Sequence, residues 1–498
     1  MYPLVIFPDS ALYLAQAKAF LHGEFAFRFM GNEPKALQPL FPLMSAILSF
    51  IFPSVEIAGT IVSVLSGSII IFLVYYLSKK IFGPTTAVIA SFIVTFDPIL
   101  INFSIIPMSE ALFTLLLIMT VLLSWHMTNI RNPLYFIIIG IVIGLSFLTR
   151  VIGVALLIPP ILWLIINNYR KDIMRDVLLP VLFISSGFIL TSTPYWTIVH
   201  QVQHKWMLTG FYGGVWEGMT QQHPLINIHG ADNGLYGFLY RYIKSATLYI
   251  TTFFSSISLL VTAFMILSLF MKRNRENLWK SCYLLLWIGS FFFVSVLFPP
   301  TTDDNFLRYL MPIIPLLFIL SSQGIVLLED ILMRLIKTAK TNYNKAIRYA
   351  YLFTVLLLLL LSFISEYSKI QQFSWPFIWL REKQNVLTSQ DVGDKIKNIL
   401  RHSTGIIARK PYVPYYADAV WYPISKHTTY EDIKGLAKQG NEFLYLDSSA
   451  YDISKNLVFL LDPVNKPAEL TPVIWIQDKD TLKYKVVLYH IRQVKTVP

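Results

Sequence analysis

Long apolar runs, separated by short polar segments, occupy most of the chain up to about residue 366. A helix needs roughly 17 to 25 apolar residues to cross a bilayer. The runs of that length predict about ten spanning helices and hence an all-α polytopic membrane bundle. The block 40–53, LFPLMSAILSFIFP, is shorter and bounded by Pro, so we expect a helix at the membrane interface. The ten runs are 56–78, 84–103, 109–128, 133–149, 151–168, 176–198, 246–271, 278–298, 307–328 and 346–366.

The pattern changes at about residue 371, where short apolar stretches alternate with polar residues. TGIIARKPYVPYYAD, TTYEDIKGLAKQG and NEFLYLDSS predict strand, helix and strand, and VIWIQD and KYKVVLYHIRQV predict two further strands. We therefore expect an outer segment at 1–55, a bundle at 56–366 with a long loop at 199–245, and a small C-terminal α/β domain at 371–498.

Composition supports a membrane protein. With 55% hydrophobic and 14% charged residues and a mean hydropathy of +0.56, the chain has too little polar surface for a soluble globule of its size. The formal net charge is +12, but the basic residues form short clusters between apolar runs, so we exclude nucleic acid as a partner. Cys282 is the single cysteine, so no intramolecular disulfide can form.

Basic residues also predict the orientation. With 1–55 outside, the inner loops hold fifteen Lys and Arg residues and the outer positions hold five. Cytoplasmic loops carry such an excess, so segment 1–55 and the C-terminal domain are expected on the outer face of the cell membrane. No spanning helix precedes 1–55, so we expect that a leading helix is missing from this reading frame, with post-translocation of a short tail as the alternative. The inner residues are Lys79, Lys80, Arg131, Arg170, Lys171, Arg175, Lys272, Arg273, Arg275, Lys280, Arg334, Lys337, Lys340, Lys345 and Arg348, and the outer ones Arg150, Lys205, Arg241, Lys244 and Arg308.

Asp9 stands directly before a predicted helix at 11–21, which contains strong helix formers and no Gly or Pro. The spacing predicts Asp9 or Ser10 at the N-cap. Tyr13 and Gln16 follow on the same helix face as Asp9. One interpretation is a helix cap and the other a functional carboxylate, and this stretch alone leaves both open.

Ionisable residues gather at the predicted outer boundary, where they are costly and therefore candidates for function. Each also has an ordinary explanation. Arg150 can extend to water, and Glu110 suits the start of a helix. Asp303 and Asp304 suit a solvated loop. Their convergence on one face favours a reaction between a membrane donor with an anionic head and an acceptor from outside. The full set is Asp9, Lys35, Glu110, Arg150, Asp303, Asp304 and Arg308.

Four histidines, His200, His204, His223 and His229, lie in or beside the long loop. Only the first two have a spacing of the kind that metal ligands use, and that spacing alone is weak. We therefore predict no cofactor and assign no metal, and we leave a divalent metal ion open.

Five segments carry a resemblance to a known family: PDSALYLAQAKAFLHGEF, KALQPLFPLMSAI, PMSEALFTLLL, FLTRVIGV and RYLMPIIPLL. As a set, within about residues 1–330, they resemble the C-type (GT-C) membrane glycosyltransferases, in particular the dolichyl-phosphate-mannose-protein mannosyltransferases and the lipid A aminoarabinose transferases. The resemblance implies a GT-C-like bundle, a polyprenyl-phosphate sugar as donor, and inversion at the anomeric carbon. The acceptor stays open among a protein, a glycolipid and a glycan.

The resemblance also implies roles. Asp9 matches the family's catalytic acid, and a carboxylate can accept the proton of an attacking hydroxyl. Lys35, Arg150 and Arg308 are the cations expected to bind the donor phosphate. Ser10 departs from the pattern, because many relatives have a second acid there. Supporting candidates are Tyr13, Glu110, Asp303 and Asp304.

Two other classes of function remain as alternatives. A transporter or flippase of lipid-linked sugars should carry ionisable groups near the membrane midplane and often an internal repeat. A non-catalytic scaffold would only display domain 371–498.

Overall fold

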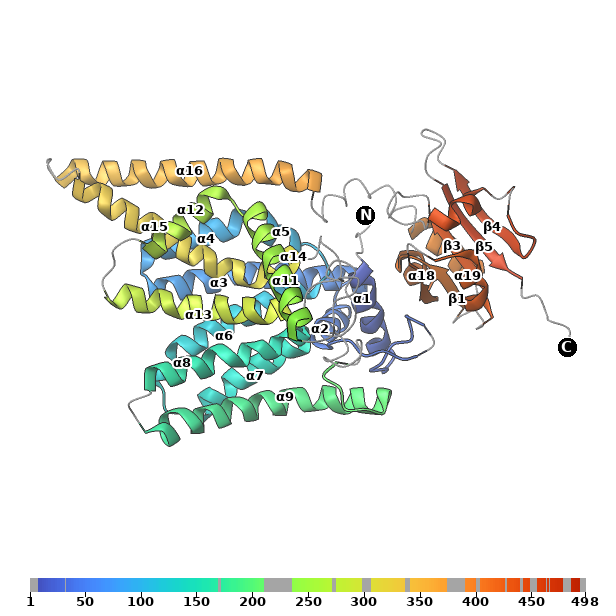
Figure 1. Cartoon of the computed structure of the whole chain (residues 1–498), viewed down its shortest axis with the longest axis horizontal. Helices are drawn as coiled ribbons and strands as arrows, with labels where there is room; N and C mark the ends of the chain where they lie inside the picture. The colour runs from blue at the N-terminus through green and yellow to red at the C-terminus, as the bar shows by residue number, and fades with distance from the viewer. Residues whose placement is uncertain are drawn as a thin grey trace. The chain divides into compact units, whose positions relative to one another are not determined.

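The computed structural model describes the chain in two compact units (Figure 1). The helical unit comprises Gln38–Met44 and Ala58–Ile378, and the mixed unit comprises Met1–Leu37, Ser45–Ile57 and Trp379–Pro498. Residues 1–37 thus belong with the C-terminal residues. The described residues are 8–31, 33–168, 172–209, 235–270, 275–297, 306–335, 341–373, 390–399, 404–425, 428–438, 442–447, 455–462, 464, 466–477 and 485–492.

Helices account for each apolar run that the sequence singles out. After α2 (Leu40–Leu48), the expected interfacial helix, the chain continues through α-helices with short 3-10 and π segments between them. They are α3 (Val55–Ile81), α4 (Pro84–Phe96), α5 (Pro98–Ser104), α6 (Ser109–His126), η1 (Met127–Asn129), α7 (Pro133–Thr149), η2 (Val151–Leu157), α8 (Ile158–Asn168), η3 (Met174–Leu178), α9 (Leu179–Gln203), α11 (Leu235–Ser256), α12 (Leu259–Phe270), α13 (Arg275–Leu297), α14 (Phe306–Leu310), η5 (Met311–Ile313), α15 (Ile314–Leu335) and α16 (Thr341–Phe373).

The number of spanning helices is lower than predicted. Among the described residues, seven helices are long and apolar enough to cross a membrane, or eight if α4 and α5, bent by 61°, count as one. The expected spans at 133–149 and 246–271 are not among them. Helix α7 has 17 residues, and the run at 246–271 is divided between α11 and α12. The multi-pass helical membrane fold itself is confirmed.

The bend between α4 and α5 has a local cause. Pro98 lacks a backbone N–H and opens α5, while the side chain of Asp97 accepts a hydrogen bond from the backbone N–H of Leu100 at 2.9 Å. Asp97 is 3% exposed, so this cap also satisfies a buried carboxylate. One helix therefore ends and another begins at this residue.

Helices α7 and α9 pack at very short range. A Cβ added to Gly140 would lie 2.0 Å from the carbonyl oxygen of Ile184, and one added to Gly187 would lie 2.3 Å from that of Ile137. Small residues allow membrane helices this approach. Both positions therefore require glycine.

The mixed unit contains a five-stranded sheet of order β2-β1-β3-β5-β4. Strand β1 runs parallel to β2 and β3, whereas β5 runs antiparallel to β3 and β4. Its core includes Ile407, Leu444 and Val487 from the sheet and Ile433 from helix α19. The expected small α/β domain is confirmed, with β2 as a strand that the sequence pattern missed. The elements are β1 (Gly405–Ala408), α18 (Tyr412–Tyr416), β2 (Val420–Pro423), α19 (Tyr430–Ala437), β3 (Phe443–Asp447), η6 (Lys455–Leu461), β4 (Leu470–Gln477) and β5 (Lys485–Ile491).

The start of the chain joins this sheet. After helix α1 (Pro8–Leu21), Phe29 accepts a hydrogen bond from the backbone N–H of Trp421 at 2.6 Å, and Gly31 donates one to the carbonyl oxygen of Trp421 at 2.9 Å. Met30 thereby pairs in parallel with Trp421 of β2. The amino-terminal segment extends the sheet beyond β2, which would otherwise be its edge strand.

We expect Gly140→Ala to lower the free energy of unfolding by about 1–3 kcal/mol, because the Ile184 carbonyl cannot yield without moving α7 away from α9. Thermal unfolding of the purified protein in detergent measures this. Gly289→Ala is the control, since nothing lies within 4 Å of a Cβ there and Ala favours a helix. Equal melting temperatures for Gly140→Ala and the native chain would contradict the close packing.

Candidate functional site

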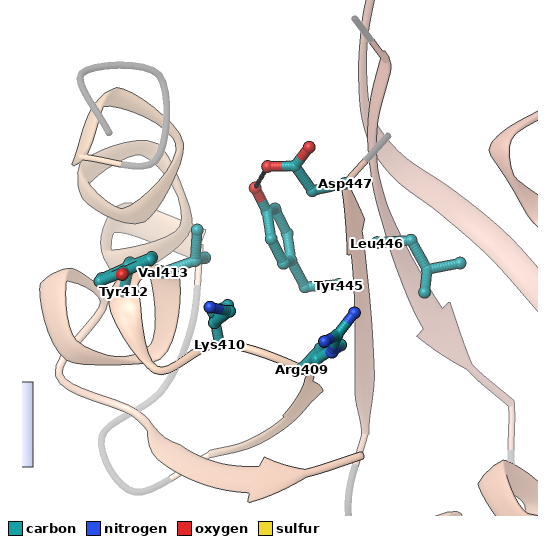
Figure 2. A pocket seen from close by; sticks show the side chains of 7 residues that line it. All are labelled: Arg409, Lys410, Tyr412, Val413, Tyr445, Leu446 and Asp447. Atoms are coloured by element: carbon teal, nitrogen blue, oxygen red, sulfur yellow. Dashed lines mark hydrogen bonds between the residues drawn. The ribbon is translucent and has the colours of Figure 1, made fainter. Parts of the chain in front are cut away.

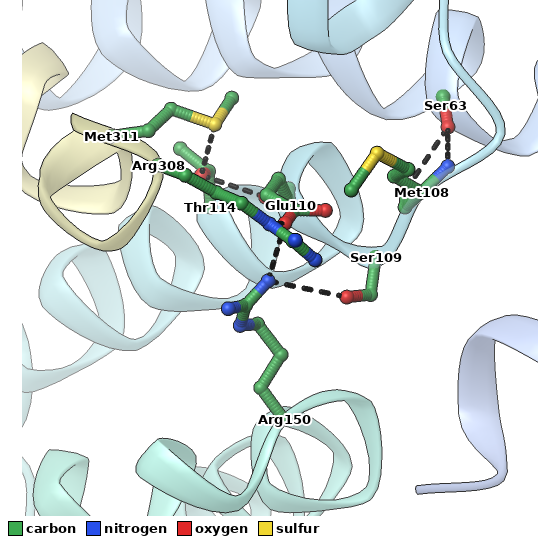
Figure 3. Close-up of polar contacts among 8 residues, drawn as sticks. All are labelled: Ser63, Met108, Ser109, Glu110, Thr114, Arg150, Arg308 and Met311. Carbon is green, nitrogen blue, oxygen red and sulfur yellow. Dashed lines mark hydrogen bonds and ion pairs between the residues drawn. The ribbon is translucent and has the colours of Figure 1, made fainter. Parts of the chain in front are cut away.

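A buried cluster of charged side chains lies in the helical unit (Figure 3). Arg150 donates from Nη1 to Oε1 of Glu110 at 2.6 Å, and Arg308 donates from Nε to the same oxygen. Arg150 Nη1 also lies 3.4 Å from the hydroxyl of Ser109, and its guanidinium lies 5.2 Å from the centre of the Tyr309 ring. One carboxylate thus binds two arginines.

The connectivity of the helices explains why these residues meet. Glu110 stands in the first turn of α6, and Arg150 directly follows α7, the next α-helix along the chain. Consecutive membrane helices run in opposite directions, so the start of α6 and the end of α7 share one end of the bundle. Arg308, in α14, precedes the long helix α15 and reaches the same end.

Burial makes this cluster energetically important. The side chain of Glu110 is 0% exposed, and those of Arg150 and Arg308 are 12% and 10% exposed. Removing one partner of a buried ion pair typically costs about 3–5 kcal/mol, because a charge remains without compensation. Two arginines and one glutamate leave a net positive charge, and Oε2 of Glu110 has no hydrogen-bond partner among the described residues. The cluster therefore joins three segments and retains attraction for an anion.

Asp9 and Lys35 lie in the mixed unit. Helix α1 begins at Pro8, so Asp9 is in its first turn and the expected N-cap position is wrong. Gln16 fixes the following loop to α1, because its side-chain amide accepts from the backbone N–H of Leu37 at 3.1 Å and donates to the Leu37 carbonyl at 3.3 Å. Lys35 Nζ lies 3.5 Å from Glu33 in an exposed pair, which contributes little to stability. Tyr13, partly buried, lies on α1.

A second set of contacts ties α1 to the sheet domain. Lys18 Nζ lies 3.2 Å from Asp418 Oδ1 and 4.0 Å from the centre of the Tyr415 ring, and Lys397 binds the other oxygen of Asp418. Burial alone would raise the pKa of Asp418, but the two ammonium groups outweigh it and the pKa lies below its ordinary value. The Tyr415 hydroxyl donates to Glu56 at 2.6 Å, and burial together with this carboxylate raises the pKa of Tyr415 well above its ordinary value.

Sequence reasoning missed these connecting residues. Lys18 and Asp418, or Glu56 and Tyr415, are separated by hundreds of positions, and no local pattern links them. Of the other candidates, Asp303, Asp304, His223 and His229 lie outside the described residues. His200 stacks on Trp206 at 4.4 Å between ring centroids. Across the part of the chain that the structure describes, no group of three His, Cys, Asp or Glu residues could hold a metal ion.

Part of the chain is similar to a known protein family. Residues 32–196 match the family model of the dolichyl-phosphate-mannose-protein mannosyltransferases. This region contains Lys35, Glu110 and Arg150 but neither Asp9 nor Arg308. A comparison with curated proteins finds no match.

Solved structures of two other proteins share the fold. ArnT from Cupriavidus metallidurans bound to undecaprenyl phosphate superposes with a TM-score of 0.59 at 12% identity, over 97% of this chain and 94% of that chain. The oligosaccharyltransferase of Archaeoglobus fulgidus in the apo form gives a TM-score of 0.56 at 12% identity, over 89% of this chain and 66% of that chain. Its complex with an inhibitory peptide and a dolichol-phosphate gives 0.54 at 12% identity over the same shares, 89% and 66%.

The family match and the shared fold show what the chain resembles. Residues 32–196, less than half of the chain, match the mannosyltransferase family model, and the resemblance expected from the sequence motifs is confirmed over that segment. The whole chain shares the fold of ArnT and of the archaeal oligosaccharyltransferase, and several of its helices are long and apolar enough to cross a membrane.

We expect Glu110→Gln to lower the free energy of unfolding by about 3–5 kcal/mol, because two buried guanidinium groups lose the charge that they share. Thermal unfolding in detergent measures the loss. Glu276→Gln removes an acid paired with Lys280 at 2.6 Å, but this acid is 72% exposed, and a change within about 0.5 kcal/mol is expected there. An equally small effect of Glu110→Gln would refute the proposed stabilising role of the cluster.

The Asp418 pair predicts a pH dependence. Its pKa is lower in the folded state, so the ionised carboxylate stabilises the fold above the unfolded pKa of about 3.9, and this stabilisation disappears as the pH falls through the folded value. Asp418→Asn should therefore have a lower melting temperature than the native chain at neutral pH. Its melting temperature should fall by less than that of the native chain when the pH is lowered to about 3.

Asparagine suits this test, because residue 418 has a φ of 48° and Asn tolerates the left-handed region. Melting curves at a series of pH values provide the measurement. Glu442→Gln, at an exposed acid of the same unit, serves as control and should follow the native profile. Parallel profiles for Asp418→Asn and the native chain would contradict the pKa direction.

Proposed function

We propose that the enzyme transfers a sugar from a polyprenyl-phosphate donor to an acceptor hydroxyl at the outer face of the cell membrane, with inversion at the anomeric carbon. The observation that carries the proposal is the convergence of Arg150 and Arg308 on Glu110, which leaves a net positive charge at one end of the bundle. ArnT binds undecaprenyl phosphate and the archaeal enzyme binds a dolichol-phosphate, which supports a lipid phosphate as the donor's leaving group.

The two arginines are proposed to bind the donor phosphate. A guanidinium has five N–H donors in a planar fork that suits phosphate oxygens. An arginine that binds Glu110 through one nitrogen can therefore bind a phosphate through another. When the bond from the anomeric carbon to the phosphate oxygen breaks, the electron pair stays on the lipid phosphate, and the adjacent positive charge stabilises it. Lys35 is proposed as a further cation for this phosphate.

Asp9 is proposed as the general base. The acceptor oxygen attacks the anomeric carbon from the side opposite the leaving phosphate, and its proton passes to the Asp9 carboxylate. The new glycosidic bond forms as the bond to the phosphate breaks, so atoms and charge balance without a cofactor. Tyr13, one helical turn after Asp9 on α1, is a candidate for orienting it.

The outer face is supported by the distribution of basic residues. Lys79 and Lys80 end α3 and Arg334 lies in the last turn of α15. Glu110, in contrast, starts α6, at the end of the bundle that it shares with Arg150 and Arg308. Cytoplasmic ends carry an excess of Lys and Arg, so the cluster is proposed to lie at the opposite, outer end. Charges at helix ends also fit a transferase better than a transporter, whose charged groups lie near the midplane.

We expect Asp9→Asn to lower the rate of sugar transfer by about 10²–10⁴-fold in a protein that still folds, because the amide cannot accept the proton. The assay follows labelled sugar from a panel of polyprenyl-phosphate donors in reconstituted membranes. Glu24→Gln, at an exposed acid of the same amino-terminal segment, should keep the native rate. A native rate of transfer by Asp9→Asn would exclude Asp9 as the base. If the native protein consumes none of the donors, a polyprenyl-phosphate sugar is not its donor.

A further inference from the structure

The order of the strands creates a potential binding position in the sheet domain. From β1 the chain crosses to β2 on one side of β1 and then returns to form β3 on the other side, with all three strands parallel. The connection after β1 leads to β2 on one side, and the connection after β3 leads to β4 on the other side, so the two leave the sheet in opposite directions. In open α/β sheets, ligands bind outside the carboxyl ends of the strands at such a switch point.

A pocket lies at this position (Figure 2). Arg409 and Lys410 directly follow β1, Tyr445 and Asp447 come from the end of β3, and Tyr412 begins α18. The space open to water-sized groups is about 20 Å³, which is room for one or two of them. The pocket can therefore enclose one group of a ligand, with the rest of the ligand outside.

The side chains define the chemistry of that group. Arg409 and Lys410 supply two adjacent cations, and an arginine fork suits phosphate oxygens. Asp447 is 8% exposed, and the Tyr445 hydroxyl lies 3.4 Å from its Oδ2. A buried carboxylate beside a phenol can accept from and donate to the hydroxyl groups of a sugar. Cations and hydroxyl-binding groups thus share one pocket.

We propose that this pocket binds a sugar phosphate, with the phosphate on Arg409 and Lys410 and a neighbouring hydroxyl on Tyr445 and Asp447. The site lies wholly within the mixed unit and goes beyond the transfer reaction. The ligand has two sources with the same chemistry, a soluble sugar phosphate and the phosphorylated sugar-like headgroup of a lipid.

Calorimetric titration of the full-length protein in detergent tests the site without a donor or acceptor, so its result is independent of the transferase assay. The probes are glucose 6-phosphate, inorganic phosphate and glucose. We expect saturable binding of glucose 6-phosphate, weaker binding of phosphate and none of glucose. Arg409→Ala and Lys410→Ala should each weaken the binding of glucose 6-phosphate by about tenfold or more, which corresponds to about 1.4 kcal/mol.

Matched variants distinguish the pocket from general charge. Lys434→Ala removes an exposed cation of the same domain outside the pocket and should bind as the native chain does. Tyr445→Phe should weaken the binding of glucose 6-phosphate but not the binding of inorganic phosphate. If the alanine substitution at either position lowers the melting temperature, the milder substitution Lys410→Gln or Arg409→Lys is titrated in its place. No saturable binding of glucose 6-phosphate, or an equal loss in Lys434→Ala, would overturn the proposal.

A competition experiment between glucose 6-phosphate and a phosphoinositide lipid identifies the source of the ligand. The protein is placed in phosphatidylcholine nanodiscs with or without phosphatidylinositol 4-phosphate, and glucose 6-phosphate is titrated again. Loss of binding only in discs with the phosphoinositide supports a lipid headgroup as the ligand. Unchanged binding in both kinds of disc supports the soluble sugar phosphate.

Discussion

The buried pairing of Glu110 with Arg150 and Arg308 is a strong constraint on the helical unit. A charged side chain among membrane helices is costly unless an opposite charge compensates it. The start of α6, the end of α7 and helix α14 must therefore meet whenever the chain folds. Because the arginines outnumber the acid, the same contact that joins these segments also attracts an anion. Structure and proposed chemistry rest on one group of atoms.

The mixed unit applies a comparable constraint to Asp9. Helix α1 is held by Gln16 on its own loop and by Lys18 on Asp418, and the segment after it pairs with Trp421 at the edge of the sheet. These contacts join residues from the two ends of the chain. The C-terminal domain thus forms the framework for the segment that carries the proposed base, whatever it binds in its own pocket. A change in that domain can therefore displace α1.

The sequence predicts those parts of the structure that depend on local pattern. Each predicted apolar run contains helix, and alternation of helix direction places Glu110, Arg150 and Arg308 at one end. The pattern failed at 246–271, because hydropathy does not register the break between α11 and α12. It also missed β2 and the contacts of Lys18 and Tyr415, because these depend on partners hundreds of residues away. Asp9 lies inside α1 and not at its N-cap, a shift of the kind that helix boundaries ordinarily show.

An experimental structure of the protein with a bound polyprenyl phosphate is the most direct test of the proposed role of the arginines. We predict that the phosphate lies within hydrogen-bond distance, about 2.7–3.2 Å, of nitrogens of Arg150 and Arg308, with Glu110 still bound to both. A phosphate held elsewhere, with both arginines bound to Glu110 alone, would contradict this role and leave the cluster as a purely structural tie.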